Sequence, residues 1–93
     1  MSIWIRKVEG KEQENYIELG TGEWDLRTLV KLFEKWLKNE GKELDDTVTW
    51  IADIGFSPRE GANGGGPILS PEILSICVNK NMYLYLSEYD DRE

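Results

Sequence analysis

The segment from Leu26 to Glu40 constrains the fold of this chain most, because its apolar residues recur at steps of three and four. That spacing is typical of a helix with one apolar side. Asp25 is a favourable N-cap residue, and Gly41 is the residue expected just after the last turn. A helix of this kind needs a second layer to cover its apolar side. The residues that we predict to lie in the core are Leu29, Phe33 and Trp36.

Alternation in the last part of the chain predicts a strand. Met82, Leu84 and Leu86 share one side, which we expect to fill the core beneath the helices. The other predicted elements are strands at Ile3–Val8, Tyr16–Leu19 and Thr47–Phe56, and a short helix from Pro71 to about Lys80. The order ββαβαβ predicts an α+β fold, a two-layer sandwich in which a four-stranded sheet carries both helices on one face. No linker divides the chain, so residues 1–93 are predicted to form a single domain.

Charge and composition limit what the chain can bind. The formal net charge is −7, and the field of such a protein opposes direct binding to nucleic-acid phosphates. A basic partner and solubility alone both fit this charge, and the sequence leaves the two open. No apolar run is long enough to span a membrane, and the N-terminus does not resemble a signal peptide. We therefore expect a cytoplasmic protein that does not bind membranes.

The chain has no His and a single Cys, so the commonest general base and the usual zinc ligands are missing. Cys77 lies in an apolar stretch, where a free thiol usually acts as a small buried hydrophobe. The acidic pairs Asp45-Asp46 and Asp90-Asp91 lack the ligand spacing of a calcium loop. We expect no enzymatic activity, no metal site and no cofactor.

A glycine-rich loop, Gly61 to Gly66, connects the third strand to the second helix. Its flexible backbone and the N–H groups at the start of that helix form a candidate site for a small anion or a nucleotide. The candidate ligand-binding residues are Arg59, Gly64, Gly65, Gly66 and Ser70. The loop matches neither the GxxxxGK(S/T) nor the GxGxxG phosphate-binding motif, so an exposed connector is the other interpretation.

Aromatic residues provide a second candidate site, on the side of the sheet away from the helices. The candidate partner-binding residues are Tyr83, Tyr85, Tyr89, Trp4 and Tyr16. Such a surface can anchor a protein partner or stack nucleic-acid bases, and the negative charge favours a protein. Ordinary cross-strand pairing of tyrosines is the alternative explanation.

Basic residues also form a stripe on the exposed side of the long helix. The basic stripe comprises Arg27, Lys31, Lys35 and Lys38. Glu34 precedes Lys38 by four residues, a spacing that favours an ion pair on a helix surface. We expect this stripe to be a solvated helix face.

The sequences GGGPILSPEIL and MYLYLSEYD lie between Gly64 and Tyr89. This part of the chain resembles the ending of small bacterial α+β domains of unknown function that are often grouped with toxin-immunity proteins. The resemblance implies a non-enzymatic role in binding a partner, and it supplies no catalytic residues.

These observations predict a small, acidic, cytoplasmic module that binds another protein, with toxin neutralisation as its most specific form. The alternative is a domain that binds a small molecule or nucleotide through the Gly61–Gly66 loop and the start of the second helix. The oligomeric state stays open.

Overall fold

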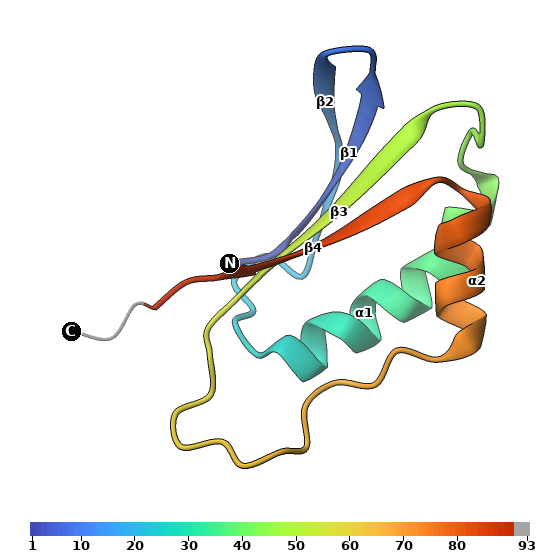
Figure 1. Ribbon diagram of the computed structural model, residues 1–93. Coiled ribbons are helices and arrows are strands. Elements are labelled where there is room, and N and C mark those ends of the chain that lie inside the picture. Colours follow the sequence, from blue (N-terminus) through green and yellow to red (C-terminus); the bar gives the residue numbers. More distant parts are fainter. Residues whose placement is uncertain (91–93) are drawn as a thin grey trace.

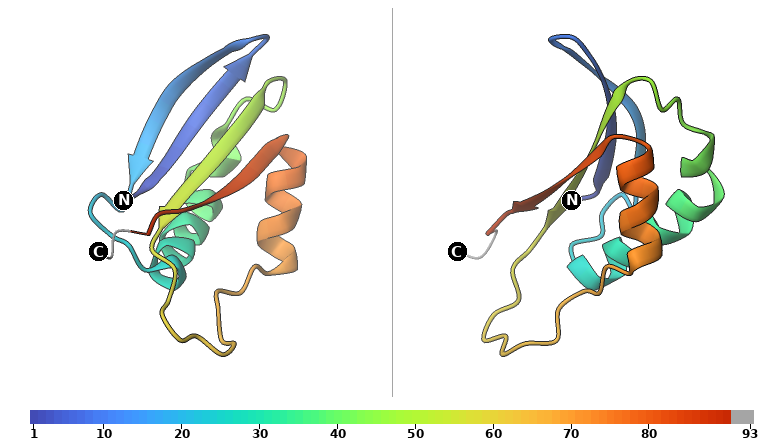
Figure 2. Two further views of the ribbon diagram at one scale, coloured as in Figure 1. Left: turned by 60° about the vertical axis from the view of Figure 1, so that its left-hand side comes forward. Right: turned by 45° about the vertical axis from the view of Figure 1, so that its right-hand side comes forward.

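A four-stranded mixed sheet forms one layer of the protein, and both helices cover the same face of it (Figures 1 and 2). The computed structural model describes residues 1–90, so Asp91 of the second acidic pair lies outside the described residues. The elements are β1 (Ile3–Glu9), β2 (Glu12–Leu19), α1 (Leu26–Asn39), the 3₁₀ turn η1 (Gly41–Glu43), β3 (Thr49–Phe56), α2 (Pro71–Asn79) and β4 (Met82–Glu88). This arrangement confirms the predicted α+β fold and its ββαβαβ order.

The strands lie in the order β2-β1-β3-β4, so β2 and β4 are the two edges of the sheet. β1 is antiparallel to both β2 and β3, whereas β3 and β4 are parallel. A parallel pair needs a crossover connection, and the segment from residue 57 to α2 provides it. Figure 1 shows this long connection leaving the end of β3 and passing beyond α1 before α2 begins.

The hairpin at the N-terminus is longer than the sequence suggested. The strands predicted at Ile3–Val8 and Tyr16–Leu19 leave Glu9–Asn15 as the turn between them, but the turn is confined to Gly10 and Lys11 and β2 begins at Glu12. The residues Glu12–Asn15 pair with the second half of β1 and are exposed on both faces. An edge strand without a buried face needs no apolar alternation, and so the strand carried no recognisable pattern.

The core lies between the sheet and the helices. Leu29, Phe33 and Trp36 are buried there, as predicted, against Ile3 and Trp50 of the sheet. Leu86 departs from the expectation for β4, because 55 % of its surface is exposed. Met82 is buried and Leu84 is half-buried, so β4 runs out of helix cover toward its C-terminal end.

Both helices begin at the residues that the sequence indicated. The Asp25 side chain accepts a hydrogen bond from the Thr28 N–H, and Ser70 Oγ accepts one from the Ile73 N–H. Gly41 follows the last turn of α1 as expected, but for a different reason. Its φ is not positive; instead, a Cβ at this position would lie 2.5 Å from Cδ1 of the buried Leu37. Glycine is therefore required by close packing rather than by a left-handed backbone.

Within residues 1–90, no helix has both the length and the apolar character needed to cross a membrane.

Candidate functional site

We call the face of the sheet opposite the helices the open face, and no helix or strand among residues 1–90 forms a second layer over it (Figure 2). Strand register fixes the side chains on this face. Trp4 lies beside Asp53, which in turn lies beside Tyr85 on β4. In the next row, Arg6 and Tyr83 lie on either side of Ile51. Three strands thus contribute to one surface.

Three tyrosines on or beside this face are exposed to solvent. The exposed fractions are 62 % for Tyr83, 44 % for Tyr85 and 42 % for Tyr89. Trp4 is half-buried. Ile51 is 3 % exposed although no helix covers it, which indicates that the long side chains flanking it in its row shield it. The open face is therefore a packed surface of large side chains rather than a bare sheet.

Asp53 forms hydrogen bonds with two polar side chains of the open face, Arg6 and Ser87. Its carboxylate accepts a hydrogen bond from Arg6 Nη2 at 2.8 Å and another from Ser87 Oγ at 2.6 Å. The Arg6 and Asp53 side chains are 25 % and 17 % exposed, respectively. A partly buried, charge-assisted pair with a second donor has a defined geometry. It fixes the positions of the three strands around the tyrosines.

Tyr89 lies just beyond β4, and its ring packs on a glycine of β3. A Cβ at Gly55 would lie 3.1 Å from Cε2 of Tyr89 and 3.1 Å from Cβ of Met1. The backbone N–H of Tyr89 donates to the carbonyl of Phe56, which continues the ladder for one more residue. Gly55 thus provides the flat position against which the aromatic ring rests.

Tyr16 does not belong to the open face, contrary to the sequence-based prediction. A β-bulge interrupts the pairing of β2, because Ile5 pairs with Ile17 and Arg6 pairs with Asn15. Tyr16 is the extra residue, and its ring meets that of Trp50 edge-on, with centroids 5.0 Å apart. Trp50 is part of the core beneath the helices, so Tyr16 lies on the helix side of the sheet. A bulge shifts the two-residue alternation, which alternation alone cannot reveal.

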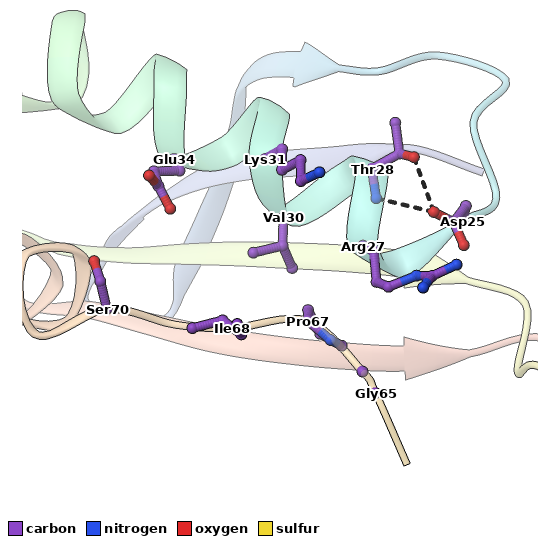
Figure 3. Close-up of a pocket in the computed structure, with 11 residues that line it drawn as sticks. Asp25, Arg27, Thr28, Val30, Lys31, Glu34, Gly65, Pro67, Ile68 and Ser70 are labelled. Carbon is purple, nitrogen blue, oxygen red and sulfur yellow. Dashed lines mark hydrogen bonds between the residues drawn. The ribbon is translucent and has the colours of Figure 1, made fainter. Parts of the chain in front are cut away.

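A groove of about 690 Å³ lies between α1 and the end of the crossover connection (Figure 3). Its α1 wall consists of Asp25, Arg27, Thr28, Val30, Lys31 and Glu34. Its other wall consists of Gly65, Gly66, Pro67, Ile68 and Ser70. Figure 3 shows Val30 and Lys31 on the helix above Pro67 and Ile68 on the connection.

The groove brings together part of the predicted ligand site. Gly65, Gly66 and Ser70 line it. Arg59 and Gly64 do not line it. Arg59 Nη2 donates instead to the Gly64 carbonyl at 2.6 Å, so its side chain joins two parts of the same loop. Proline contributes no backbone donor at positions 67 and 71, and Ser70 Oγ already accepts from an N–H of the first turn of α2.

Arg27 and Lys31 are the basic residues of the groove, and the ligand site predicted from the sequence does not include them. Both belong to the basic stripe, which was interpreted as a solvated face. The four-residue spacing of the stripe was the available signal, but nothing in the sequence placed the connection opposite it. Within residues 1–90, no ion pair is found for either residue, whereas Lys38 of the same stripe is paired.

Lys38 links the two helices. Its Nζ lies 2.9 Å from Oε1 of Glu72 on α2 and 3.2 Å from Oε1 of Glu34 on α1. The hydrogen bond to Glu72, followed by that to Glu34, raises the pKa of Lys38, and the same contact lowers the pKa of Glu72. These contacts join α1 to α2 at Glu34, which also lines the groove.

Cys77 is buried in α2, and burial raises the pKa of its thiol to about 11. A thiol with such a pKa is almost entirely protonated at neutral pH and is therefore a poor nucleophile. In the part of the chain that the structure describes, no three acidic or Cys side chains come together in a group able to hold a metal ion.

Comparison of this chain with models of protein families, with curated proteins and with solved structures finds no match.

Proposed function

We propose that this protein is a small cytoplasmic module that binds another protein through its open face and catalyses no reaction. The observation that supports this proposal is the exposure of Tyr83, Tyr85 and Tyr89 beside Trp4 on a sheet face without helices. Tyr and Trp give up large apolar area on binding and carry polar groups that tolerate water when free. These residue types are enriched among the residues that dominate protein interfaces.

The partner that fits this surface best is a basic protein. The net charge of −7 attracts positively charged proteins over long range and repels nucleic-acid phosphates. On the open face itself, Glu18 lies next to Trp4 in the same row as Asp53. Arg6 neutralises Asp53, so Glu18 would supply negative charge at the rim of the tyrosine surface.

Toxin neutralisation is the specific form of this function that we propose. An inhibitor of this kind needs a rigid surface that binds tightly and needs no chemistry of its own. The Arg6–Asp53–Ser87 hydrogen bonds support such rigidity, because they join β1, β3 and β4 under the tyrosines. A preformed surface loses less conformational entropy on binding.

The test begins with the product of a gene adjacent to the one that encodes this chain, purified and titrated against the protein by calorimetry. We expect Tyr85→Ala to weaken binding by at least about tenfold, which corresponds to roughly 1.4 kcal/mol. Tyr16→Ala is the matched control, because Tyr16 is similarly exposed but lies on the helix side of the sheet. Binding should also weaken with added salt.

If the wild type and Tyr85→Ala are both folded and bind the partner with equal affinity, the open face is not the binding surface. Loss of affinity in Tyr16→Ala alone would place the contact on the helix side instead.

The groove supports a second candidate function, the binding of a small anion such as a nucleotide. Arg27 and Lys31 face the glycine backbone there, and neither forms an ion pair within the described residues. Titration with inorganic phosphate and with a nucleoside triphosphate, followed by NMR of the backbone amides, tests this function. We expect shifts at Gly65 and Gly66 that vanish in Arg27→Gln, whereas shifts independent of Arg27 would argue against a site.

A further inference from the structure

Among residues 1–90, no strand pairs with the outer edge of β4. In a parallel pair, alternate residues direct both their N–H and C=O groups to the neighbouring strand. The Asn81 carbonyl accepts from Trp50 and the Tyr89 N–H donates to Phe56, so odd-numbered residues of β4 face β3. The backbone groups of Met82, Leu84 and Leu86 therefore point away from the sheet.

The two edges of the sheet are built differently. β2 carries Glu12, Glu14 and Glu18 and is broken by the bulge at Tyr16. Charges and bulges of this kind prevent the edge of a sheet from pairing with another strand. β4 has no charged residue between Met82 and Ser87, no proline and no bulge. β4 thus lacks the protection that β2 has.

The helix beside this edge exposes apolar side chains toward it. Val78 is 74 % exposed and Leu74 is 43 % exposed on α2. Glu72 reaches Lys38 and therefore marks the side of α2 that faces α1. At 100° per residue, Leu74 and Val78 lie on the opposite side of α2, beyond the buried Ile73. Figure 2 shows α2 as the outermost helix, next to β4.

The segment that forms this part of the surface has no net charge. Between Ile68 and Ser87, the charged residues are Glu72 and Lys80, whose charges cancel. The rest of the chain accounts for the whole net charge of −7. Two copies that associate through this region therefore keep their acidic surfaces apart, and the repulsion between them is smaller than at other parts of the surface.

The sequence of β4 is nearly palindromic about Leu84, reading Met-Tyr-Leu-Tyr-Leu from Met82 to Leu86. If two copies pair antiparallel about Leu84, the outward backbone groups of Met82 in one copy meet those of Leu86 in the other. Tyr83 then lies opposite Tyr85 on the open face, and the aliphatic residues lie opposite one another on the helix side. A two-fold interface requires this kind of self-complementarity.

We propose that the protein forms a two-fold symmetric homodimer in which the β4 strands of two copies pair antiparallel about Leu84. The two sheets join into one that is twice as wide, and Leu86 of each copy covers the exposed flank of α2 of the other. Both open faces stay uncovered and become continuous. The dimer does not depend on the proposed function.

Sedimentation equilibrium on the wild type tests the proposal, and we expect a dimer. Val78→Glu and Leu86→Glu each introduce a charge into the interface and should raise the dissociation constant at least about tenfold. Ile68→Glu is the matched control, because Ile68 is 82 % exposed and lies at the groove rather than at the edge. This variant should dimerise like the wild type. Circular dichroism verifies that each variant is folded.

Amide hydrogen exchange gives an independent readout. In a monomer, the N–H groups of Leu84 and Leu86 point to solvent and exchange fast; in the dimer they are bonded, so their exchange should slow as protein concentration rises. A wild type that stays monomeric at about 1 mM would overturn the proposal. Protection that appears only when a different protein is added would also overturn it, in favour of strand addition by that protein. If the wild type is a monomer and Tyr85→Ala still binds the partner more weakly than the wild type, the dimer is wrong and the proposed function stands.

Discussion

Arg6 Nη2 lies 2.8 Å from Oδ2 of Asp53, and this contact joins β1 to β3 in the middle of the open face. Asp53 Oδ1 accepts from Ser87 Oγ, so the same carboxylate also reaches β4. Trp4 and Tyr85 lie on either side of Asp53. The most polar group of this face thus sets the spacing of its aromatic residues.

Removing this carboxylate should destabilise the protein. Asp53→Ala loses two hydrogen bonds and leaves the partly buried Arg6 without its acceptor, at a cost of about 1–3 kcal/mol. Urea unfolding measures the free energy of unfolding. Asp53→Asn keeps an acceptor oxygen and should fall between the wild type and Asp53→Ala. Equal stability of all three proteins would contradict the structural role that we assign to Asp53.

Phe33 is completely buried in the centre of the core. Phe33→Ala should therefore lower the free energy of unfolding by about 3–5 kcal/mol, because it removes apolar contacts and leaves a cavity. Lys35→Ala on the exposed side of the same helix is the control and should change stability by less than about 0.5 kcal/mol. Similar effects of the two changes on the free energy of unfolding would contradict the packing of the Phe33 side of α1 against the sheet.

Gly55 and Gly66 test the packing of Tyr89. A methyl group at Gly55 would lie 3.1 Å from the ring of Tyr89, whereas nothing lies within 4 Å of one at Gly66. Neither glycine has a positive φ. Gly55→Ala should cost about 1–3 kcal/mol in thermal or urea unfolding. Gly66→Ala should be neutral or slightly stabilising, because it restricts the unfolded chain.

The N-cap of α1 should make stability depend on pH. The hydrogen bonds from Thr28 lower the pKa of Asp25 in the folded protein below its ordinary value. The cap therefore stabilises fully above the pKa of Asp25 in the unfolded chain, and its contribution is lost as the pH falls through the folded pKa. At neutral pH, Asp25→Ala should cost about 1 kcal/mol, and the difference from wild type should shrink in acid.

Asp25→Asn provides the control for this prediction, since an amide oxygen caps the helix without titrating. Urea unfolding of the three proteins over a series of pH values gives the comparison. A difference between wild type and Asp25→Ala that does not change with pH would contradict a titrating cap.

Local signals in the sequence predicted the helices well. Asp25 and Ser70 each cap the helix that follows, and their hydrogen bonds involve residues within three positions. A signal of such short range does not depend on the rest of the fold. The position of Gly41 was also predicted, but its close approach to Leu37 depends on how the turn packs, and so the physical reason differed.

Features set by pairing between distant strands were harder to predict. The bulge at Tyr16 depends on the register of β2 against β1, and it moved that ring to the helix side. Leu86 alternates correctly with the tyrosines, but alternation does not tell where the helix layer ends. The groove forms where α1 and the crossover connection meet, and the sequence of neither segment predicts that contact.

The parallel pairing of β3 with β4 also has a consequence for the order of folding. β1 and β2 are joined by a tight turn and close a short loop, whereas β4 can pair only after the crossover connection and α2 have been placed. Contacts between segments far apart in sequence form slowly, because the loop entropy is lost first. Until β4 docks, β3 is itself an unprotected edge, with Trp50, Ile51 and Ile54 in one short run. Refolding yield should therefore be limited by aggregation through β3, a strand whose two edges are both paired in the finished sheet.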